Sequence, residues 1–467
     1  MELNGEIKLV GVLAVCWLAE VCSTILHASP IPLLLIAGAA IGPALWQQAP
    51  FPEALTAAGK LGVLLLVTHA GLSVDLADLR RVGVVRSALG AFAGVAAPVG
   101  FVFLAQLLFN GYPDSFEGGG DWRNTLAIGA TLAPTSLGYV TTLLRQFELH
   151  TTSLGTFVAA AAVFDDVLSL VLLAEVQAVA LKDDVSTWDV LSPLVASTAA
   201  ILCGIVLLPT IPRVLPVLER ATFKRFPFRN YDTENTREQF RLCLMLLVAT
   251  GGAIAADAAG TSDLLGAFVA GLAFNKYPSV RRQFEAHGDF AMRWLVRLFF
   301  ACTIGFSLPS LIDRDGEQTK FWKSGTLAKA SILFACAFFG KLPVAAFAHK
   351  TTLRVRGAHT DPTERTLPIA QKVLVYALAM SGRGEFSFLL AKQASEDELL
   401  TDADVAACVL ALLFICMLTP FLFLYVLHRA TGSVQMVAPD DEMELERTPS
   451  SEILCPAVLD LVSEGGE

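Results

Sequence analysis

Charged residues are scarce in this sequence. Asp, Glu, Lys and Arg make up 17% of its 467 residues and hydrophobic residues make up 54%, whereas soluble domains contain about 25% charged and about 45 to 50% apolar residues. So little charge cannot cover the surface of a globule of this length, which excludes an ordinary soluble protein. The mean hydropathy of +0.59 agrees. We therefore predict an integral, multi-pass membrane protein.

Patterns typical of enzymes and of nucleic-acid-binding proteins are also missing. The sequence has no GxSxG or HExxH motif, so no catalytic nucleophile or zinc site is predicted. Its nine cysteines lie mostly in apolar runs without a CxxC spacing, as expected for small buried side chains rather than metal ligands or disulfides. No basic stripe with interleaved aromatic residues occurs. We expect no enzyme activity, no cofactor and no nucleic-acid partner.

Apolar runs long enough to cross ~30 Å of hydrocarbon as helices recur along the chain. The first run lacks a basic leader, so we predict a retained helix rather than a signal peptide. Together the runs predict an all-α membrane domain over residues 1–430. The thirteen expected spans are 9–26, 31–48, 58–76, 84–109, 123–143, 152–181, 190–212, 240–259, 262–277, 293–311, 325–348, 367–393 and 403–428.

Lysines and arginines are distributed unequally over the two sides of this helix arrangement. Connections after the third, fifth, seventh, ninth and eleventh segments, with the C-terminal tail, hold 22 of them, and the opposite side holds 8. Cytoplasmic loops are enriched in Lys and Arg, so we predict an outside N-terminus and a cytoplasmic C-terminus. Whether the membrane is the plasma membrane or an internal one stays open. Residues 431–467 form an acidic tail, which we expect to be disordered.

Short sequence similarities suggest an internal duplication. LLLIAGAAIGP around Gly38 matches LLGAFVAGLAF around Gly271, an offset of 233, and HAGLS around Gly71 matches TIGFS around Gly305, an offset of 234. The matched segments are seven apart in the order of spans, an odd number, so the two copies enter the membrane from opposite sides. This predicts the inverted repeat found in many secondary transporters.

Two corresponding spans are interrupted near the middle of the membrane. In the fifth span the interruption includes Pro134, Thr135 and Ser136, and in the twelfth it runs through Gly382, Arg383, Gly384 and Glu385. Proline removes a backbone donor and glycine removes steric restraint, so both helices are expected to break there. Freed backbone groups at such half-helix ends line polar cavities in transporters. Arg383 and Glu385 are expected to satisfy freed backbone groups or each other's charge.

The most informative stretch is VAAAAVFDDVLSLVLLAE, residues 158–175, because it places Asp165 and Asp166 in the middle of an apolar span. An ionised group at a helix centre costs ~2.5 to 3.5 kcal/mol on the insertion scale, so intramembrane acids are functional candidates. A carboxylate binds either a proton or a hard monovalent cation, and the two compete for the same oxygens. Lys341 is a candidate partner that would offset the charge of Asp165. Lys329 lies nearer a helix end, where we expect it to reach headgroups or water.

The segments PIPLLLIAGAAIGP, LGVLLLVTHAGLSVDL, AAVFDDVLSLV, LLGAFVAGLAF, RLFFACTIGFSL, FFGKLP and RGEFSFLLA occur in this order across residues 30–392. In sequence and spacing they resemble the second family of monovalent cation:proton antiporters, the sodium/hydrogen exchanger domain. The resemblance implies thirteen helices, a dimerisation domain, hence a homodimer, and a mobile core in which two broken helices cross. His69 departs from the pattern, which usually has an apolar residue there.

Carried over by position, the resemblance makes Asp166 the carboxylate that alternately holds a proton and a transient monovalent cation. It makes Asp165 the partner of Lys341, as in electrogenic members, and places Thr135 and Ser136 at the unwound crossing. The function implied is exchange of Na⁺, with K⁺ as the alternative, for protons. Rival functions are a channel or organic-anion symporter of related fold, and a sensor that does not transport.

Overall fold

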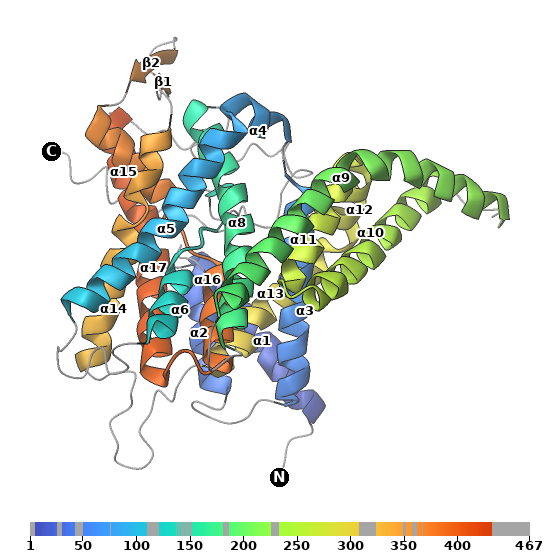
Figure 1. The fold of residues 1–467 in the computed structure, drawn as a ribbon. Helices are drawn as coiled ribbons and strands as arrows, with labels where there is room; N and C mark the ends of the chain where they lie inside the picture. The colour runs from blue at the N-terminus through green and yellow to red at the C-terminus, as the bar shows by residue number, and fades with distance from the viewer. Residues whose placement is uncertain are drawn as a thin grey trace. The chain divides into compact units, whose positions relative to one another are not determined.

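The computed structural model describes most of the chain (Figure 1). The chain forms two compact units. The first unit comprises residues 1–55, 75–169 and 300–467, and the second comprises 56–74 and 170–299. The tail predicted to be disordered, apart from residue 431, lies outside the described residues. Described are residues 5–25, 30–42, 50–74, 76–109, 121–136, 138, 140–141, 144, 149, 152–180, 186–225, 233–307, 324–348, 352–356, 362–366 and 368–431.

The first unit contains most of the segments that position the candidate site. Several of its apolar helices are too short to cross a bilayer on their own. Its helices are α1 (Gly5–Ile25), α2 (Pro30–Ile41), α4 (Leu76–Val82), α5 (Val84–Leu108), α6 (Trp122–Leu132), the first part of α8 (Ser153–Ala180), α14 (Ser324–Phe339), α15 (Ile369–Ala379), α16 (Glu385–Glu396) and α17 (Asp402–Thr431), with a π-helix η1 (Phe299–Ile304) and 3₁₀-helices η2 (Gly305–Ser307) and η3 (Leu342–Phe347).

The described residues of the second unit form helices joined by turns, without a strand. Helices α9, α10 and α11 pack side by side in it (Figure 1). Its elements are most of α3 (Pro52–Leu72), the second part of α8, α9 (Thr187–Arg225), α10 (Thr233–Ala258), α11 (Asp263–Ala273), α12 (Pro278–His287) and α13 (Asp289–Leu298).

The helix lengths agree with a chain that crosses a bilayer many times. Seven described segments are long and apolar enough to span it on their own, and α2, α11 and α15 are shorter apolar helices of 11 or 12 residues. Two predicted spans contain broken helices: α6 ends at Leu132, and α15 ends at Ala379 before α16 begins at Glu385. The fold is therefore the nearly all-helical, polytopic one that the sequence predicts.

Two details of the fold differ from the expected straight spans. A short antiparallel hairpin, β1 (Thr352–Arg356) with β2 (Pro362–Thr366), lies in the connection between the eleventh and twelfth expected spans. The tenth expected span runs through α13 and then changes into the π-helix η1 and the 3₁₀-helix η2. Periodicity of apolar residues does not distinguish α from π turns, so the sequence reading missed this change.

The packing of glycines bears on the predicted inverted repeat. A Cβ atom at Gly38 of α2 would collide with the backbone carbonyl of Ala301 in η1, and a Cβ atom at Gly271 of α11 would collide with the backbone carbonyl of Thr68 in α3. Residue 38 shifted by 233 is residue 271, and residue 68 shifted by 233 is residue 301. Equivalent helices of the two copies therefore make the same close backbone contact, one in each unit.

The apolar core of the first unit fixes the helix that carries the acid pair. Phe157 of α8 lies edge-on to Tyr376 of α15, with ring centroids 5.5 Å apart and planes at 87°. Both side chains are at most 2% exposed, and they belong to one buried cluster that also includes Val344 of η3 and Phe423 of α17. This arrangement places α8, α15, α17 and the segment after α14 around one centre.

His69 lies in the second unit, in the last turn of α3. Its ring stacks on Phe284 of α12, with centroids 5.2 Å apart and planes at 12°. Its Nε2 atom lies 3.6 Å from a carboxylate oxygen of Glu285. This histidine and then the guanidinium of Arg281 lower the pKa of Glu285 to about 2, since neighbouring donors favour the charged carboxylate. His69 is thus a packed residue that ties α12 to α3.

Candidate functional site

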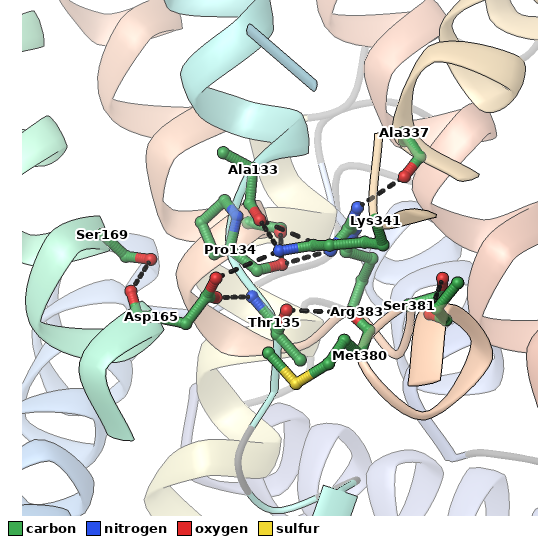
Figure 2. A network of polar contacts seen from close by, with 12 residues as sticks. Ala133, Pro134, Thr135, Asp165, Ser169, Ala337, Lys341, Met380, Ser381 and Arg383 are labelled. Atoms are coloured by element: carbon green, nitrogen blue, oxygen red, sulfur yellow. Dashed lines mark hydrogen bonds and ion pairs between the residues drawn. The ribbon is translucent and has the colours of Figure 1, made fainter. Parts of the chain in front are cut away.

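The break after α6 is held by a contact with the second broken helix. Beyond Leu132 the chain leaves the α-helix and has no regular secondary structure through Pro134, Thr135 and Ser136. The amide of Ser136 donates to the carbonyl of Gly382 at 2.9 Å, and the hydroxyl of Thr135 donates to the carbonyl of Met380 at 2.8 Å (Figure 2). The structure thus brings together the two interruptions that the sequence predicted, although they are about 250 residues apart.

Gly384 marks the closest approach of the two interrupted segments. A Cβ atom built there would lie 2.6 Å from both the Cβ and the Oγ atoms of Ser136. Its φ of −152° is negative, so the glycine does not occupy the left-handed region. The short distance to Ser136 leaves no space for a side chain at this position.

We expect Gly384→Ala to destabilise the folded protein by about 1 to 3 kcal/mol, the usual cost of overpacking. The double variant Gly384→Ala/Ser136→Gly removes the atoms that collide and should recover most of that loss. Thermal unfolding of the detergent-solubilised protein measures both. If Gly384→Ala is as stable as the wild type, the two segments do not cross this closely.

Arg383 lies at the centre of this crossing with a side chain only 2% exposed. Its guanidinium donates to the carbonyl of Pro134 at 2.9 Å, to that of Ala133 at 3.4 Å and to that of Ala337 at 3.0 Å (Figure 2). The last carbonyls of a helix have no intrahelical partner and carry partial negative charge. The arginine therefore serves the carbonyls left free where α6 ends, which is one of the two roles expected from the sequence.

Asp165 is completely buried, and both of its carboxylate oxygens have partners. The amide of Thr135 donates to Oδ2 at 2.5 Å, and Nζ of Lys341 donates to Oδ1 at 3.0 Å. Its backbone carbonyl accepts from the hydroxyl of Ser169 at 2.6 Å (Figure 2). The carboxylate of Asp165 therefore has one donor on each oxygen.

Lys341 has no exposed side-chain surface. Besides Asp165, its ammonium group donates to the carbonyl of Ala133 at 2.7 Å. This geometry depends on a helix break, because α14 ends at Phe339 and the 3₁₀-helix η3 begins directly after the lysine. The motif FFGKLP contains the signal for it, since Gly340 and Pro343 flank the lysine and both disfavour a continuous α-helix.

Asp166 differs from its neighbour in its contacts. The residue is 3% exposed, but its Oδ1 atom has no hydrogen-bond partner among the residues that the structure describes. Consecutive positions of a helix point ~100° apart, so Asp166 cannot share the partners of Asp165. A buried carboxylate oxygen without a donor is costly unless it takes up a proton or a cation. The arrangement can therefore hold one of these at Asp166.

Glu385 is half-buried and begins α16. A negative charge at a helix N-terminus is favourable because of the helix dipole. Ser387, in the first turn of α16, donates to the carbonyl of Pro134 at 3.3 Å. The first turn of α16 thus contributes an acid and a hydroxyl to the same crossing, and the hydroxyl was not singled out from the sequence.

The interpretation of Lys329 from the sequence is wrong. The residue is 5% exposed, and its Nζ atom lies 2.5 Å from Oδ1 of Asp404 at the start of α17. The pair is joined by Asn124 in the first turn of α6. From the sequence, a lysine in the second turn of a membrane helix is consistent with either headgroup contact or an ion pair. The contact with Asp404, which is distant in the sequence, shows that it is an ion pair.

A family model described as "Sodium/hydrogen exchanger, transmembrane" matches residues 10–424 of the chain. This chain belongs to the sodium/hydrogen exchanger family. The match covers all elements of the site from α6 to α16, and it agrees with the resemblance seen in the sequence motifs.

The chain is also similar to individual antiporters in sequence and to one solved structure in fold. It is 26% identical to the Na⁺/H⁺-K⁺ antiporter GerN of Bacillus cereus over 84% of this chain and 88% of that protein. It is 27% identical to cation/H⁺ antiporter 20 of Arabidopsis thaliana over 80% of this chain, but spans only 41% of that longer protein. The structure of the sodium proton antiporter MjNhaP1 from Methanocaldococcus jannaschii superimposes with a TM-score of 0.56 at 16% identity, over 92% of this chain and 98% of that one. This last likeness shows the shared fold.

Proposed function

We propose that this exchanger is a secondary active antiporter that moves a monovalent cation in one direction and protons in the other by alternating access. The observation that carries the proposal is the buried Oδ1 atom of Asp166, which has no hydrogen-bond partner among the described residues, beside Asp165, whose two carboxylate oxygens both accept hydrogen bonds. One carboxylate that takes either a cation or a proton gives obligatory exchange, because the two compete for the same oxygens.

Each neighbour of Asp166 has a separate part in this proposal. Asp165 and Lys341 form the charge pair that distinguishes the cation-loaded from the proton-loaded core. The crossing through Pro134, Thr135 and Ser136 and through Gly382, Arg383, Gly384 and Glu385 provides the polar surroundings in which a cation exchanges its water for protein oxygens. Arg383 holds the carbonyl end of α6 in place for this purpose.

We further propose Na⁺ as the favoured cation, with K⁺ as the alternative, because GerN is named for both. The membrane domain comprises residues 1–430, and the acidic tail 431–467 follows it. From the distribution of Lys and Arg we propose an outside N-terminus and a cytoplasmic C-terminus. The active form is a homodimer, as the family resemblance implies, and no cofactor or enzymatic step is involved.

Transport by the purified protein in proteoliposomes tests this function. Vesicles with an acidic interior and a fluorescent pH reporter receive Na⁺, K⁺ or Li⁺ outside, with choline as control. An antiporter dissipates the pH gradient on addition of its own cation only, and uptake of the labelled cation depends on that gradient. A channel would move the cation without a proton gradient, and an organic-anion symporter or a silent sensor would leave the gradient unchanged with all three ions.

We expect a variant ending after residue 431 to retain exchange, since the site lies between α6 and α16 and the acidic tail carries nine acids against one arginine in residues 438–467. The same pH-gradient assay with the truncated protein measures this. Complete loss of exchange in a truncated protein that elutes as a single species would instead make the tail part of the transport mechanism.

A further inference from the structure

A second buried polar cluster lies in the first unit, away from the acid pair. At its centre is Asp404, which is 5% exposed. Oδ1 of Asp404 accepts from Nζ of Lys329 at 2.5 Å, and Oδ2 accepts from Nδ2 of Asn124 at 2.8 Å and from the amide of Thr401 at 3.1 Å. Both oxygens are therefore satisfied. In this the cluster differs from Asp166, whose Oδ1 atom has no hydrogen-bond partner among the described residues.

The carboxylate of Asp404 is fixed to its own helix by a capping box. Thr401 is the residue before α17, and its hydroxyl accepts from the amide of Asp404 at 3.3 Å while its own amide donates to the carboxylate. Reciprocal bonds of this kind hold the first turn of a helix rigid. The position at which Asp404 receives Lys329 and Asn124 is therefore set by the helix start and not by a mobile side chain.

The cluster joins the starts of α6 and α14, and beyond the other ends of these helices Lys341 contacts Ala133. Asn124 is in the first turn of α6 and Lys329 in the second turn of α14, and the amide of Asn124 also donates to the carbonyl of Leu399 at 2.9 Å. At their other ends, the carbonyl of Ala133 accepts from Lys341 at 2.7 Å. Along α6, Asn124 lies about 14 Å from Ala133, and along α14, Lys329 lies about 15 Å from Phe339, two residues before Lys341, at 1.5 Å per residue.

Helices α6, α14 and α17 contact one another in pairs (Figure 1). With a tie at each end, α6 and α14 form a closed frame, so a shift at the Asp404 end moves Lys341 against the carbonyl end of α6. A buried ion pair adds little stability compared with apolar side chains of similar volume, and its best-attested use is to fix register. Fixing the register of two helices is a role that suits the Lys329–Asp404 pair, because it joins the second turn of α14 to the first turn of α17.

We propose that Asp404, together with Lys329 and Asn124, is a positioning site of the exchanger that sets where Lys341 lies against α6 and thereby sets the cation affinity at Asp166. The inference rests on the proposed function of Asp166 and Lys341. None of the three residues touches the transported ion. They act by holding α6 and α14 in position, in the way that outer-shell residues position the ligands of a metal.

The test compares the cation KM with the maximal rate in proteoliposomes. Loss of an outer-shell partner typically weakens metal binding 10- to 100-fold, so Asp404→Asn and Lys329→Gln should raise the KM for Na⁺ about tenfold. The maximal rate should change much less, because the groups that bind the ion remain. Asn124→Ala, a milder change, should raise the KM in the same direction by less, and Lys329→Arg should keep it near the wild-type value.

A matched control separates positioning from stability. Arg241 and Glu219 form a two-bond ion pair in the second unit, with contacts of 2.5 and 3.1 Å. Glu219→Gln should lower the thermal unfolding temperature but leave the KM unchanged. If Asp404→Asn fails to fold, Asn124→Ala and Lys329→Gln carry the same test. Wild-type KM values in the folded variants, or an equal rise in Glu219→Gln, would overturn the positioning role.

The outcome for Asp166→Asn distinguishes this inference from the function on which it rests. If that variant is inactive while the Asp404, Lys329 and Asn124 variants keep the wild-type KM, the positioning site fails and the exchange site stands. If Asp166→Asn exchanges normally, the exchange site itself is wrong, and a changed KM in the other variants would have a different cause.

Discussion

Replacing Asp166 by asparagine should abolish cation-dependent proton movement while leaving the protein folded. The amide has nearly the same shape as the carboxylate, but it neither gains a proton nor attracts a cation. Asp166 is 3% exposed and its Oδ1 atom has no hydrogen-bond partner in the described part of the chain, so the substitution removes no hydrogen bond from that atom. The fluorescent pH signal of vesicles with an imposed gradient should fall to the level of protein-free vesicles.

The control for this variant is Asp257→Asn, an identical chemical change at an exposed position of α10 in the second unit. It should exchange at the wild-type rate. Elution of both variants as a single species shows that they are folded. Normal recovery of fluorescence with Asp166→Asn would show that the cation and the proton do not compete at this carboxylate.

The second prediction is that transport is electrogenic and that Lys341 is the reason. In the cation-loaded core Asp165 and Lys341 cancel, and the cation cancels Asp166. When protons replace the cation, Asp165 and Asp166 are both neutral while Lys341 keeps its charge. The two loaded states then differ by one unit of charge, so two protons exchange for one cation. The bond from Lys341 to Ala133 gives the ammonium group a partner in the protonated state.

Lys341→Gln should remove this charge difference. Without the ammonium group, an ionised Asp165 would be left buried and unpaired, which typically costs about 3 to 5 kcal/mol. Asp165 therefore keeps its proton throughout the cycle. The variant should either fail to exchange or exchange one proton per cation with little current. Its transport current per cation moved, recorded on a solid-supported membrane after a cation jump, is the quantity to compare with the wild type.

Lys392→Gln is the matched control for the lysine, since Lys392 makes an i,i+4 pair with the more exposed Glu396, and such pairs contribute little. It should give the wild-type current per cation. Exchange without current in the wild type, or an unchanged current per cation in Lys341→Gln, would reduce the lysine to a structural partner of Asp165.

The local chemistry of the site could be read from the sequence because each signal is contained in a few residues. Two adjacent acids in an apolar span attract attention because burying them is costly, and Pro134 and Gly384 disfavour a continuous helix at the positions where they stand. The order of the spans then predicts that the two breaks correspond, and the amide of Ser136 indeed donates to the carbonyl of Gly382. The repeat predicted around Gly38 and Gly271 reappears as equivalent close contacts.

Features that depend on distant partners could not be read in this way. Lys329 looks like an interfacial lysine until the fold brings Asp404 to it, about 75 residues later in the chain. The carbonyls served by Arg383 belong to residues about 250 and 46 positions away. Nor does hydropathy reveal the π-helix η1, because an apolar segment satisfies the length requirement of a span in either helix type.

The most direct measurement of the central claim is proton release on cation binding by the detergent-solubilised protein. Weakly buffered protein near neutral pH, with a pH dye, receives NaCl or KCl, with choline chloride as control. If the cation displaces protons at Asp166, the wild type should acidify the solution in proportion to the cation bound, by two protons per cation if Asp165 ionises as well, and Asp166→Asn should release none. Cation binding by the wild type without proton release, or equal release by Asp166→Asn, would contradict competition at this carboxylate.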